Sequence, residues 1–316
     1  MDSEAFEVHR SHLLAVAYRM LGTRADAEDA VQEAWLRYAG ADPTGIVDLR
    51  AWLTTVTARI CLDMLRSARV RRETYVGPWL PEPVVRPLPD TTFPDPGFPD
   101  PGDRAARTDE VSLALLVVLE RLTPEQRVAF VLHDVFAVPF QEIATVLGTT
   151  PAAARQLASR GRRAVSDSTI RHHADLAEQR RVLAAFLTAA ERGDLDALVA
   201  VLAPDVVAIG DGGGVAPAGR RPVHGAVQVA RFMAGLFRQA RKGPALAELV
   251  LVNGDLGLLV EATYPDGRPI VFVMAFAYAD GRITAILNQL NPAKLRRVPA
   301  PDRSRSLFRW SPAEPR

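Results

Sequence analysis

A dense run of prolines constrains the folding of this chain more than any other feature of its sequence. Nine of the 24 prolines fall between Pro78 and Pro101, in the stretch PWLPEPVVRPLPDTTFPDPGFPDP. Proline fixes φ and lacks a backbone donor, so such a stretch forms neither a helix nor a central strand and runs extended or in turns. We therefore predict a linker over residues 75–108, with separately folded domains on either side.

The bulk composition agrees with several folded domains. At 316 residues the chain is too long for one ordinary core, and 48% apolar and 24% charged residues are typical of a folded soluble protein. Cys61 is the single cysteine, which excludes a disulfide framework and a multi-cysteine metal site. The sequence has no apolar run of about 18 residues and no signal peptide. It predicts a cytoplasmic protein without a membrane partner, a cofactor or a metal.

Residues 1–74 are predicted to form a bundle of three helices. The first helix ends at Gly22, a capping box of Thr23 and Asp26 opens the second, and the third follows Asp48. The second helix is acidic, in DAEDAVQEAW, and the third ends in the basic run RSARVRR. An acidic face suits protein docking and a basic face suits nucleic acid, although each also fits an ordinary solvated surface.

Residues 109–173 have the signature of a helix-turn-helix. A capping box of Thr123 and Gln126 opens one helix, with Pro124 at the first helical position. The segment PFQEIATVLG then predicts a short amphipathic helix that ends at its glycine, and another helix follows Thr150. Two helices joined by a short glycine-containing turn, with the charge on the second, are typical of this DNA-binding motif.

The last of these helices offers side chains suited to reading bases. Ala154, Leu157 and Ala158 are predicted to pack inward. Arginine and glutamine form bidentate hydrogen bonds with guanine and adenine, and serine reaches phosphate. The predicted DNA-facing set is Ala152, Arg155, Gln156, Ser159, Arg160 and Arg163. A solvated basic helix of an ordinary helical domain is the alternative.

From residue 174 the pattern changes to a mixture of helices and strands. LAEQRRVLAAFLTAAERGDLDALVAVL predicts two helices broken at Gly193, and VVAIGD, AELVLVNG, LGLLVEATY and IVFVMAFAY predict strands. Asp-Gly turns at 266–267 and 280–281 mark hairpins between them. We assign residues 174–291 to an α+β domain and 292–316 to a basic, proline-rich tail that we expect to be mobile.

Two stretches indicate contacts between distant parts of the chain. Trp79 and Leu80 make the linker too apolar for a flexible spacer, and burying each would contribute roughly 1.5–3 kcal/mol. The glycines at 212–214 are not followed by the Gly-Lys-Ser/Thr of a phosphate loop, so we expect them to let the backbone pass close to another segment. We expect WLPEP to pack against another part of the chain.

Together these motifs resemble those of the extracytoplasmic-function (ECF) sigma factors. DAEDAVQEAWLRY and LRAWLTTVTARICLDMLRS are similar to their region 2, and RLTPEQRVAFVLHDVFAVPFQEIATVLGTTPAAARQLASRGRRA to their region 4. YVGPWLPEP, the DGGG that begins at Asp211 and the NPAKL that begins at Asn291 resemble the SigJ-like subgroup, which has a SnoaL-like extension. Val215 and Ala293 depart from that subgroup, where Lys and Asp are common.

The resemblance implies a fold and a function. The fold is multidomain, with an all-α region 2 bundle, an all-α helix-turn-helix region 4 and an α+β SnoaL-like domain, the cone-shaped cystatin/NTF2-like fold. The function is binding to the RNA polymerase core, through its β′ and β subunits, and promoter-specific transcription initiation in a stress response. Region 2 would contact the −10 element and region 4 the −35 element, and the extension would regulate both in cis.

The resemblance also implies roles for individual residues. Core binding falls to Asp26, Asp29, Gln32 and Glu33. The −10 element falls to Arg59, Asp63, Arg66 and Arg69, and the −35 element to the DNA-facing set above. The residues implied in interdomain regulation are Trp79, Leu80, Pro81, Asp211, Gly212, Gly213, Gly214, Asn291, Pro292, Lys294 and Leu295. Because the resemblance implies that DGGG and NPAKL lie near the linker, we predict that WLPEP packs on the C-terminal domain close to the DGGG turn.

Two other functions remain open from the sequence. The first is a regulator that binds DNA without polymerase and senses a small molecule in the SnoaL-like pocket. The second is an enzyme, since some SnoaL-like relatives are cyclases or isomerases that need an acid or base in an apolar pocket. The available acid–base candidates are His224, Asp205, Asp211 and Glu261. We expect no enzymatic activity, because the sequence does not bring any pair of them together.

Overall fold

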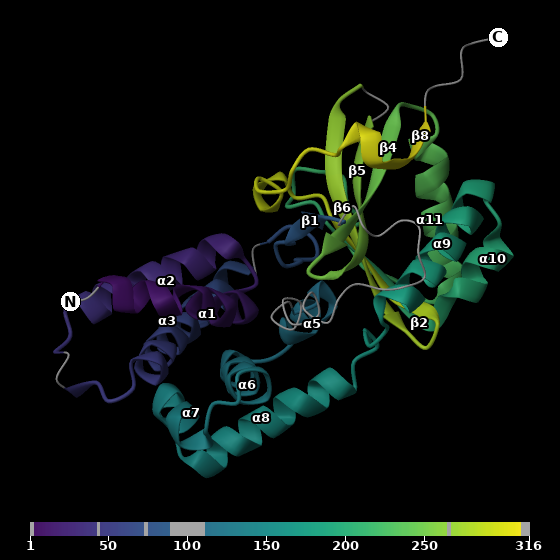
Figure 1. Ribbon diagram of the computed structural model, residues 1–316. Helices are drawn as coiled ribbons and strands as arrows, with labels where there is room; N and C mark the ends of the chain where they lie inside the picture. Colours follow the sequence, from purple (N-terminus) through teal and green to yellow (C-terminus); the bar gives the residue numbers. More distant parts are fainter. Residues whose placement is uncertain (1–2, 43–44, 73–74, 89–110, 264–266, 311–316) are drawn as a thin grey trace, which may run out of the picture. The chain divides into compact units, whose positions relative to one another are not determined.

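The computed structural model describes residues 3–42, 45–72, 75–88, 111–263 and 267–310. The chain forms two compact units, and each contains two separate stretches of sequence (Figure 1). The first unit consists of Met1–Thr74 and Leu116–Ser168, and the second of Tyr75–Leu115 and Thr169–Arg316. The described part of the predicted linker therefore belongs to the body of the second unit. The Pro-Asp-Pro-Gly repeat lies outside the described residues.

The first unit is entirely helical. It consists of α1 (Ser3–Leu21), α2 (Arg24–Ala39), α3 (Leu49–Arg72), α6 (Pro124–Phe130), the π-helical turn η3 (Val131–Val135), α7 (Phe140–Leu147) and α8 (Pro151–Ser166). Residues Leu13, Met20 and Leu53 are fully buried in its core. The helical stripes predicted from the sequence thus pack on one another.

The predicted helix ends of this unit are confirmed. Gly22 and Gly148 adopt φ of 78° and 63°, the left-handed conformation that terminates a helix and that glycine adopts without strain. Both hydrogen bonds of the Thr123–Gln126 capping box are present, and the Thr150 hydroxyl accepts from the Ala153 amide. These local interactions account for the places where the chain enters and leaves each helix.

The second unit combines helices with one sheet. Its helices are α9 (Leu176–Arg192), α10 (Leu195–Val201) and α11 (Ala226–Ala240), while α5 (Leu113–Leu119) begins in this unit and continues into the first. The strands are β1 (Val85–Pro87), β2 (Leu202–Asp211), β3 (Val223–His224), β4 (Ala245–Val252), β5 (Asp255–Thr263), β6 (Pro269–Ala279), β7 (Arg282–Gln289) and β8 (Ser306–Trp310). Their order is β1-β4-β5-β6-β7-β2-β3, with β8 also on β4.

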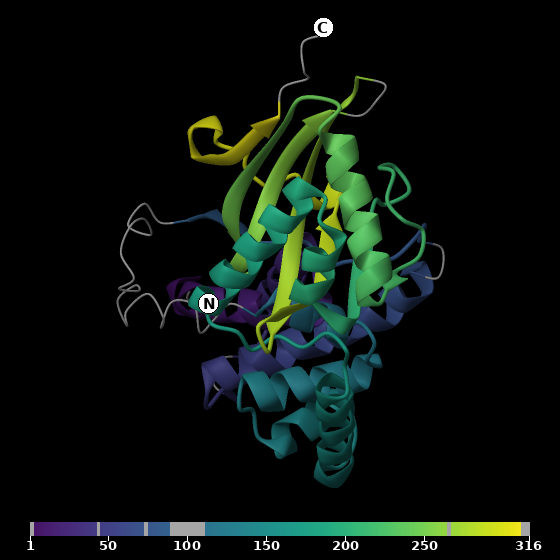
Figure 2. The same ribbon diagram turned by 90° about the vertical axis from the view of Figure 1, so that its right-hand side faces the viewer.

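The helices α9, α10 and α11 cover one face of this sheet, as Figure 2 shows. Phe186 of α9 and Phe237 of α11 pack with Phe276 and Tyr278 of β6 in a continuous apolar core. Strand β7 was not among the strands predicted from the sequence, and it pairs in parallel with β2, next to the short edge strand β3. Parallel pairing of these two strands brings their C-terminal ends side by side, where the site described below lies.

The prediction of a mobile tail is wrong for residues 292–310. This stretch forms the short 3-10 turns η4 (Pro292–Lys294) and η5 (Arg303–Arg305) and then β8, which pairs antiparallel with β4. Strand β1 of the linker pairs with the other end of β4. Both segments thus hydrogen-bond to a strand edge that would otherwise leave backbone groups unpaired, and this pairing was not apparent from composition.

No helix within the described stretches has the length and the apolar character needed to cross a lipid bilayer.

Candidate functional site

The exposed face of α8 is the one predicted to read DNA. Ala154 and Ala158 are buried, and all six residues of the predicted DNA-facing set are exposed. The sequence analysis missed Gly161, where a Cβ would lie 3.0 Å from the Phe130 Cβ and 3.2 Å from the Gln126 carbonyl oxygen. Gly161 therefore lets α8 lie close against α6, which holds the recognition face at a fixed angle.

The predicted core-binding residues of the acidic helix α2 differ in how far they are free to contact a partner protein. Asp29 and Gln32 are exposed. Asp26 has a structural role as well, because its carboxylate accepts a hydrogen bond of 2.6 Å from the Thr23 hydroxyl at the start of the helix. Glu33 forms an exposed ion pair of 3.1 Å with Arg37. Asp29 and Gln32 are therefore the residues most accessible to a protein partner.

The predicted −10 arginines of α3 are bonded to the helices of the helix-turn-helix half. Arg59 donates to the Thr145 carbonyl oxygen of α7 at 2.8 Å. Arg66 donates to the Glu125 carboxylate of α6 through Nε at 3.1 Å and Nη2 at 3.0 Å, and Asp63 lies 3.9 Å from Arg66. Arg69 is on α3, but its side chain lies outside the described part.

Glu125 is held in its ionised form at this contact. Burial raises the pKa of Glu125, but hydrogen bonds from its own backbone N–H and from Arg66 outweigh burial and hold the pKa below its ordinary value. The Arg66–Glu125 pair thus persists at neutral pH. Neither pattern nor motif predicted it, because the two residues belong to separately predicted domains.

A buried arginine joins the two halves of the first unit more deeply. Arg127 of α6 is 2% exposed, forms an ion pair with Glu120 and donates to the Arg19 carbonyl oxygen of α1 at 3.3 Å. The Arg19 guanidinium in turn lies 4.7 Å from the ring centroid of Phe136. The N-terminal bundle and the helix-turn-helix half are therefore packed as one body.

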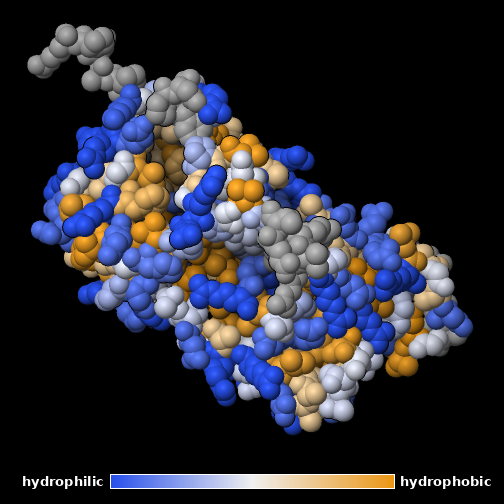
Figure 3. Space-filling view, turned by 180° about the vertical axis from the view of Figure 1, so that it is seen from behind, coloured by the Kyte–Doolittle hydropathy of each residue, from blue (hydrophilic) through white to orange (hydrophobic). Residues whose placement is uncertain are grey.

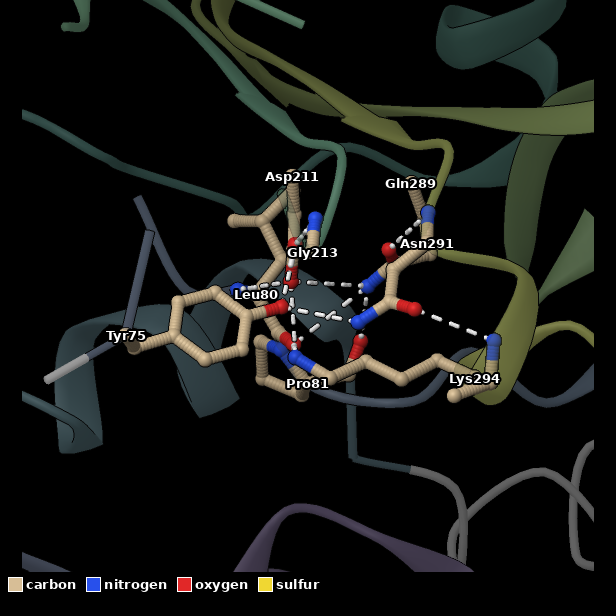
Figure 4. A network of polar contacts seen from close by, with 9 residues as sticks. Tyr75, Leu80, Pro81, Asp211, Gly213, Gln289, Asn291 and Lys294 are labelled. Atoms are coloured by element: carbon tan, nitrogen blue, oxygen red, sulfur yellow. Dashed lines mark hydrogen bonds and ion pairs between the residues drawn. The ribbon is translucent and has the colours of Figure 1, made fainter. Parts of the chain in front are cut away.

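The second unit holds the linker through a buried polar network centred on Asp211, at the end of β2 (Figure 4). The Asp211 side chain is 0% exposed. It accepts from the Tyr75 hydroxyl at 2.6 Å, from the Leu80 amide at 2.9 Å and from the Gly213 amide at 3.0 Å. Lys294 supplies the compensating charge at 2.7 Å. Fully partnered in this way, a carboxylate can stay ionised in the protein interior.

A second set of contacts, made by Lys294, Gln289 and Asn291, completes this network. Lys294 Nζ also donates to the Leu80 carbonyl oxygen at 2.6 Å and lies 4.0 Å from the ring centroid of Trp79. Gln289 Nε2 donates to the carbonyl oxygen of Pro81 at 3.1 Å, and Asn291 Nδ2 donates to the Tyr75 hydroxyl oxygen at 2.8 Å. We refer to Tyr75, Leu80, Pro81, Asp211, Gln289, Asn291 and Lys294 as the linker clamp.

The triple glycine explains why the turn after Asp211 fits in so little space. A Cβ on Gly212 would lie 2.1 Å from the Ala216 carbonyl oxygen, and a Cβ on Gly213 would lie 2.5 Å from the Asn291 side chain. Gly214 faces Val76 of the linker, and a Cβ on Gly214 would lie 3.2 Å from the Val76 Cβ. The close backbone approach expected from the sequence is therefore observed, and the segments approached are Asn291 and the linker.

The linker itself is buried where it meets this network. Leu80 is 0% exposed, and Pro81, Glu82 and Pro83 are also buried. Burial raises the pKa of Tyr75, and the hydrogen bond to Asp211 raises it further, so its hydroxyl stays protonated and keeps donating. Pro292 is exposed and Leu295 is half-buried. These two residues form the turn around Lys294, and neither makes any of the linker hydrogen bonds described above.

Comparison with known sequence families matches the two helical regions and the α+β domain. Residues 5–71 match Sigma-70 region 2, residues 112–165 match Sigma-70 region 4 and residues 183–286 match the SnoaL-like domain. The chain is 48% identical to the ECF RNA polymerase sigma factor SigJ of Mycobacterium tuberculosis, over 96% of each chain. The chain belongs to the ECF sigma factors.

Two further relatives agree with this assignment. The probable ECF sigma factor SigI of Mycobacterium tuberculosis is 43% identical, over 65% of this chain and 68% of its own. The crystal structure of Mycobacterium tuberculosis SigJ superposes with a TM-score of 0.72 at 44% identity, covering 93% of this chain and 98% of that one. This ECF sigma factor therefore binds the RNA polymerase core and directs promoter-specific transcription initiation, with a SnoaL-like extension on the same chain.

Sigma factors are initiation factors without catalytic activity, and the second unit agrees with that role. Its acid–base candidates do not converge on one place. Asp211 faces the linker, Asp205 forms an ion pair with Arg171, His224 is exposed on β3, and Glu261 lies 4.0 Å from Arg303. The predicted absence of enzymatic activity is thus supported by the family of the chain.

Proposed function

We propose that the SnoaL-like extension of this sigma factor regulates promoter recognition in cis by holding the linker. The observation that supports this proposal is the linker clamp. Asp211 and Lys294 of the extension bind the backbone and side chains of the segment that joins region 2 to region 4. A polar network with all members partnered is rigid, so the docked segment cannot extend while the clamp is intact.

The packing of the first unit supports a proposal for what the clamp controls. Arg59 and Arg66, our proposed −10 contacts, are engaged by α7 and α6 in this conformation. To meet the −10 and −35 elements at once, region 2 and region 4 must separate. We propose that the clamped linker favours the closed arrangement and that its release favours the open one.

Removal of the extension tests this proposal. Residues 173–316 contain most of the linker-binding side of the clamp, and their deletion leaves both stretches of the first unit intact. We expect run-off transcription with purified core polymerase and the cognate promoter to rise several-fold over the full-length chain. Transcription equal to that of the full-length protein would show that the extension has no part in regulation.

We further propose that α2 docks on the β′ subunit, and that the six exposed residues of α8 read the −35 element. Charge reversal at Asp29 and Glu33 is expected to weaken co-purification with core polymerase at least tenfold, because opposed charges across an interface determine association. Glu7→Arg is the matched control, since Glu7 is an exposed acid of α1 in the same unit. Equal losses in both variants would count against α2 as the docking surface.

A milder change is expected to favour opening of the first unit without replacing any residue proposed to contact DNA. Glu125→Gln removes the charge that holds Arg66, and a partly exposed ion pair contributes about 0.2–1 kcal/mol. Promoter binding by the core-bound variant should therefore tighten up to about fivefold in a fluorescence anisotropy titration. Glu7→Gln removes an equal charge and should leave the affinity as it is. If Glu125→Gln also leaves it as it is, the Arg66 contact does not oppose promoter binding.

A further inference from the structure

The second unit contains a cavity that the linker clamp does not use. Its volume is about 260 Å³, and it lies between α11 and the helix-covered face of the sheet. Figure 3 shows hydrophobic residues gathered around a recess on that part of the molecule. The walls are formed mainly by Phe232, Phe237, Leu258, Phe272 and Met274. An apolar cavity of about 150 Å³ is large enough for benzene, so this one suits a molecule of one or two rings.

The cavity has one unsatisfied polar group in its wall. Asn288 of β7 is 6% exposed, and its Oδ1 is buried without a hydrogen-bond partner among the described residues. A buried amide oxygen without a hydrogen-bond partner is costly, and such groups in native structures call for an explanation. Within the described lining no carboxylate, imidazole or thiol is present, and the one charged residue, Arg221, is exposed, so the interior of the cavity offers no charge for recognising a ligand.

The strand register connects this amide to the linker clamp. On β2 and β7, Gly210 pairs with Asn288 and Asp211 pairs with Gln289. Successive residues of a strand point to opposite faces of the sheet. Gly210 and Asn288 therefore line the cavity, and the next pair along, Asp211 and Gln289, binds the linker.

We propose that this cavity binds a neutral, apolar small molecule of one or two rings, whose single polar group hydrogen-bonds to the Asn288 amide. Such a ligand fills the apolar volume and satisfies the buried amide, and it has no charge to be stranded in the interior. The ligand also stabilises the paired ends of β2 and β7 and with them the docked linker. This second step rests on the proposed function of the clamp.

Two probes that differ by one hydroxyl test the binding site. 1-Naphthol and naphthalene are titrated into the full-length protein by isothermal titration calorimetry, with 1-naphthol expected to bind about fivefold tighter through one added hydrogen bond. Asn288→Leu keeps the side-chain size and should remove that difference. Ala262→Phe adds a ring to the cavity wall and should abolish the binding of both probes.

Three results would contradict the proposed binding site. No saturable binding, equal affinity of the two probes in the wild type, or binding that Ala262→Phe leaves intact would each contradict it. If Asn288→Leu does not fold by circular dichroism, the comparison of the two probes in the wild type still decides.

Hydrogen exchange tests the connection to the linker separately. At a probe concentration ten times Kd, a ligand that binds only the intact cavity slows any opening that disrupts it by about elevenfold. We expect exchange of the Leu80 amide, which donates to Asp211, to slow by that factor with 1-naphthol. If 1-naphthol binds but exchange of the Leu80 amide does not slow, the cavity is not coupled to the docked linker. The role of the clamp itself would then still be tested by the transcription assays.

Discussion

Leu80→Ala is expected to lower the free energy of unfolding of the C-terminal unit by about 2–5 kcal/mol, because Leu80 is fully buried and its loss leaves a cavity. Adding Trp79→Ala removes the ring against which the Lys294 ammonium lies. In the double variant we expect faster amide exchange over residues 205–215, measured by mass spectrometry, since this segment contains the clamp's central carboxylate.

An exposed aliphatic residue of the same segment provides the control. Val76 is 56% exposed, so Val76→Ala should change stability by less than about 0.5 kcal/mol. If exchange over residues 205–215 is the same in the Trp79/Leu80 variant as in the wild type, the segment is only a spacer and does not brace the domain.

Asp211→Ala is expected to have an effect of similar size, by a different mechanism. The substitution leaves the Lys294 ammonium largely buried and without its partner, which costs about 3–5 kcal/mol for a buried pair. It also removes the acceptor of the Tyr75 hydroxyl and of the Leu80 amide. Chemical denaturation of the full-length protein, followed by circular dichroism, would measure the loss.

The second unit contains a matched surface pair for comparison. Asp205 and Arg171 form a bidentate ion pair at 2.9 and 3.0 Å, with 41% and 40% of their side chains exposed. Asp205→Ala should therefore cost no more than about 1 kcal/mol. Equal losses for Asp205→Ala and Asp211→Ala would contradict the importance that we assign to the buried pair.

Local sequence rules predicted much of the fold because the interactions behind them are local. The capping box at Thr123 and the glycine that ends α7 depend on residues within one helical turn, and both are present. The inward face of α8 followed from a spacing of three and four residues. The linker's apolar residues likewise predicted burial, since transferring leucine and tryptophan side chains out of water is favourable.

Contacts between residues far apart in sequence were beyond these rules. Nothing near Asp211 indicates that Lys294 is its partner, and Arg66 and Glu125 belong to domains that we assigned separately. The tail was predicted to be mobile from its prolines and charges, whereas β8 is ordered by the free edge of β4. The cavity and the amide of Asn288 depend on the curvature of the sheet and the register of β7, neither of which the pattern of apolar residues specifies.

Transcription by a clamp variant tests the central claim most directly. Lys294→Met removes the cation of the linker clamp while leaving every proposed polymerase and promoter contact in place, and Asp205→Ala is its surface control. Multi-round transcription would be measured with purified core polymerase and the cognate promoter, at protein concentrations that saturate the core. The account predicts at least a fivefold rise for Lys294→Met and no change for Asp205→Ala. Transcription by Lys294→Met at or below the wild-type level would contradict control of this sigma factor by its linker clamp.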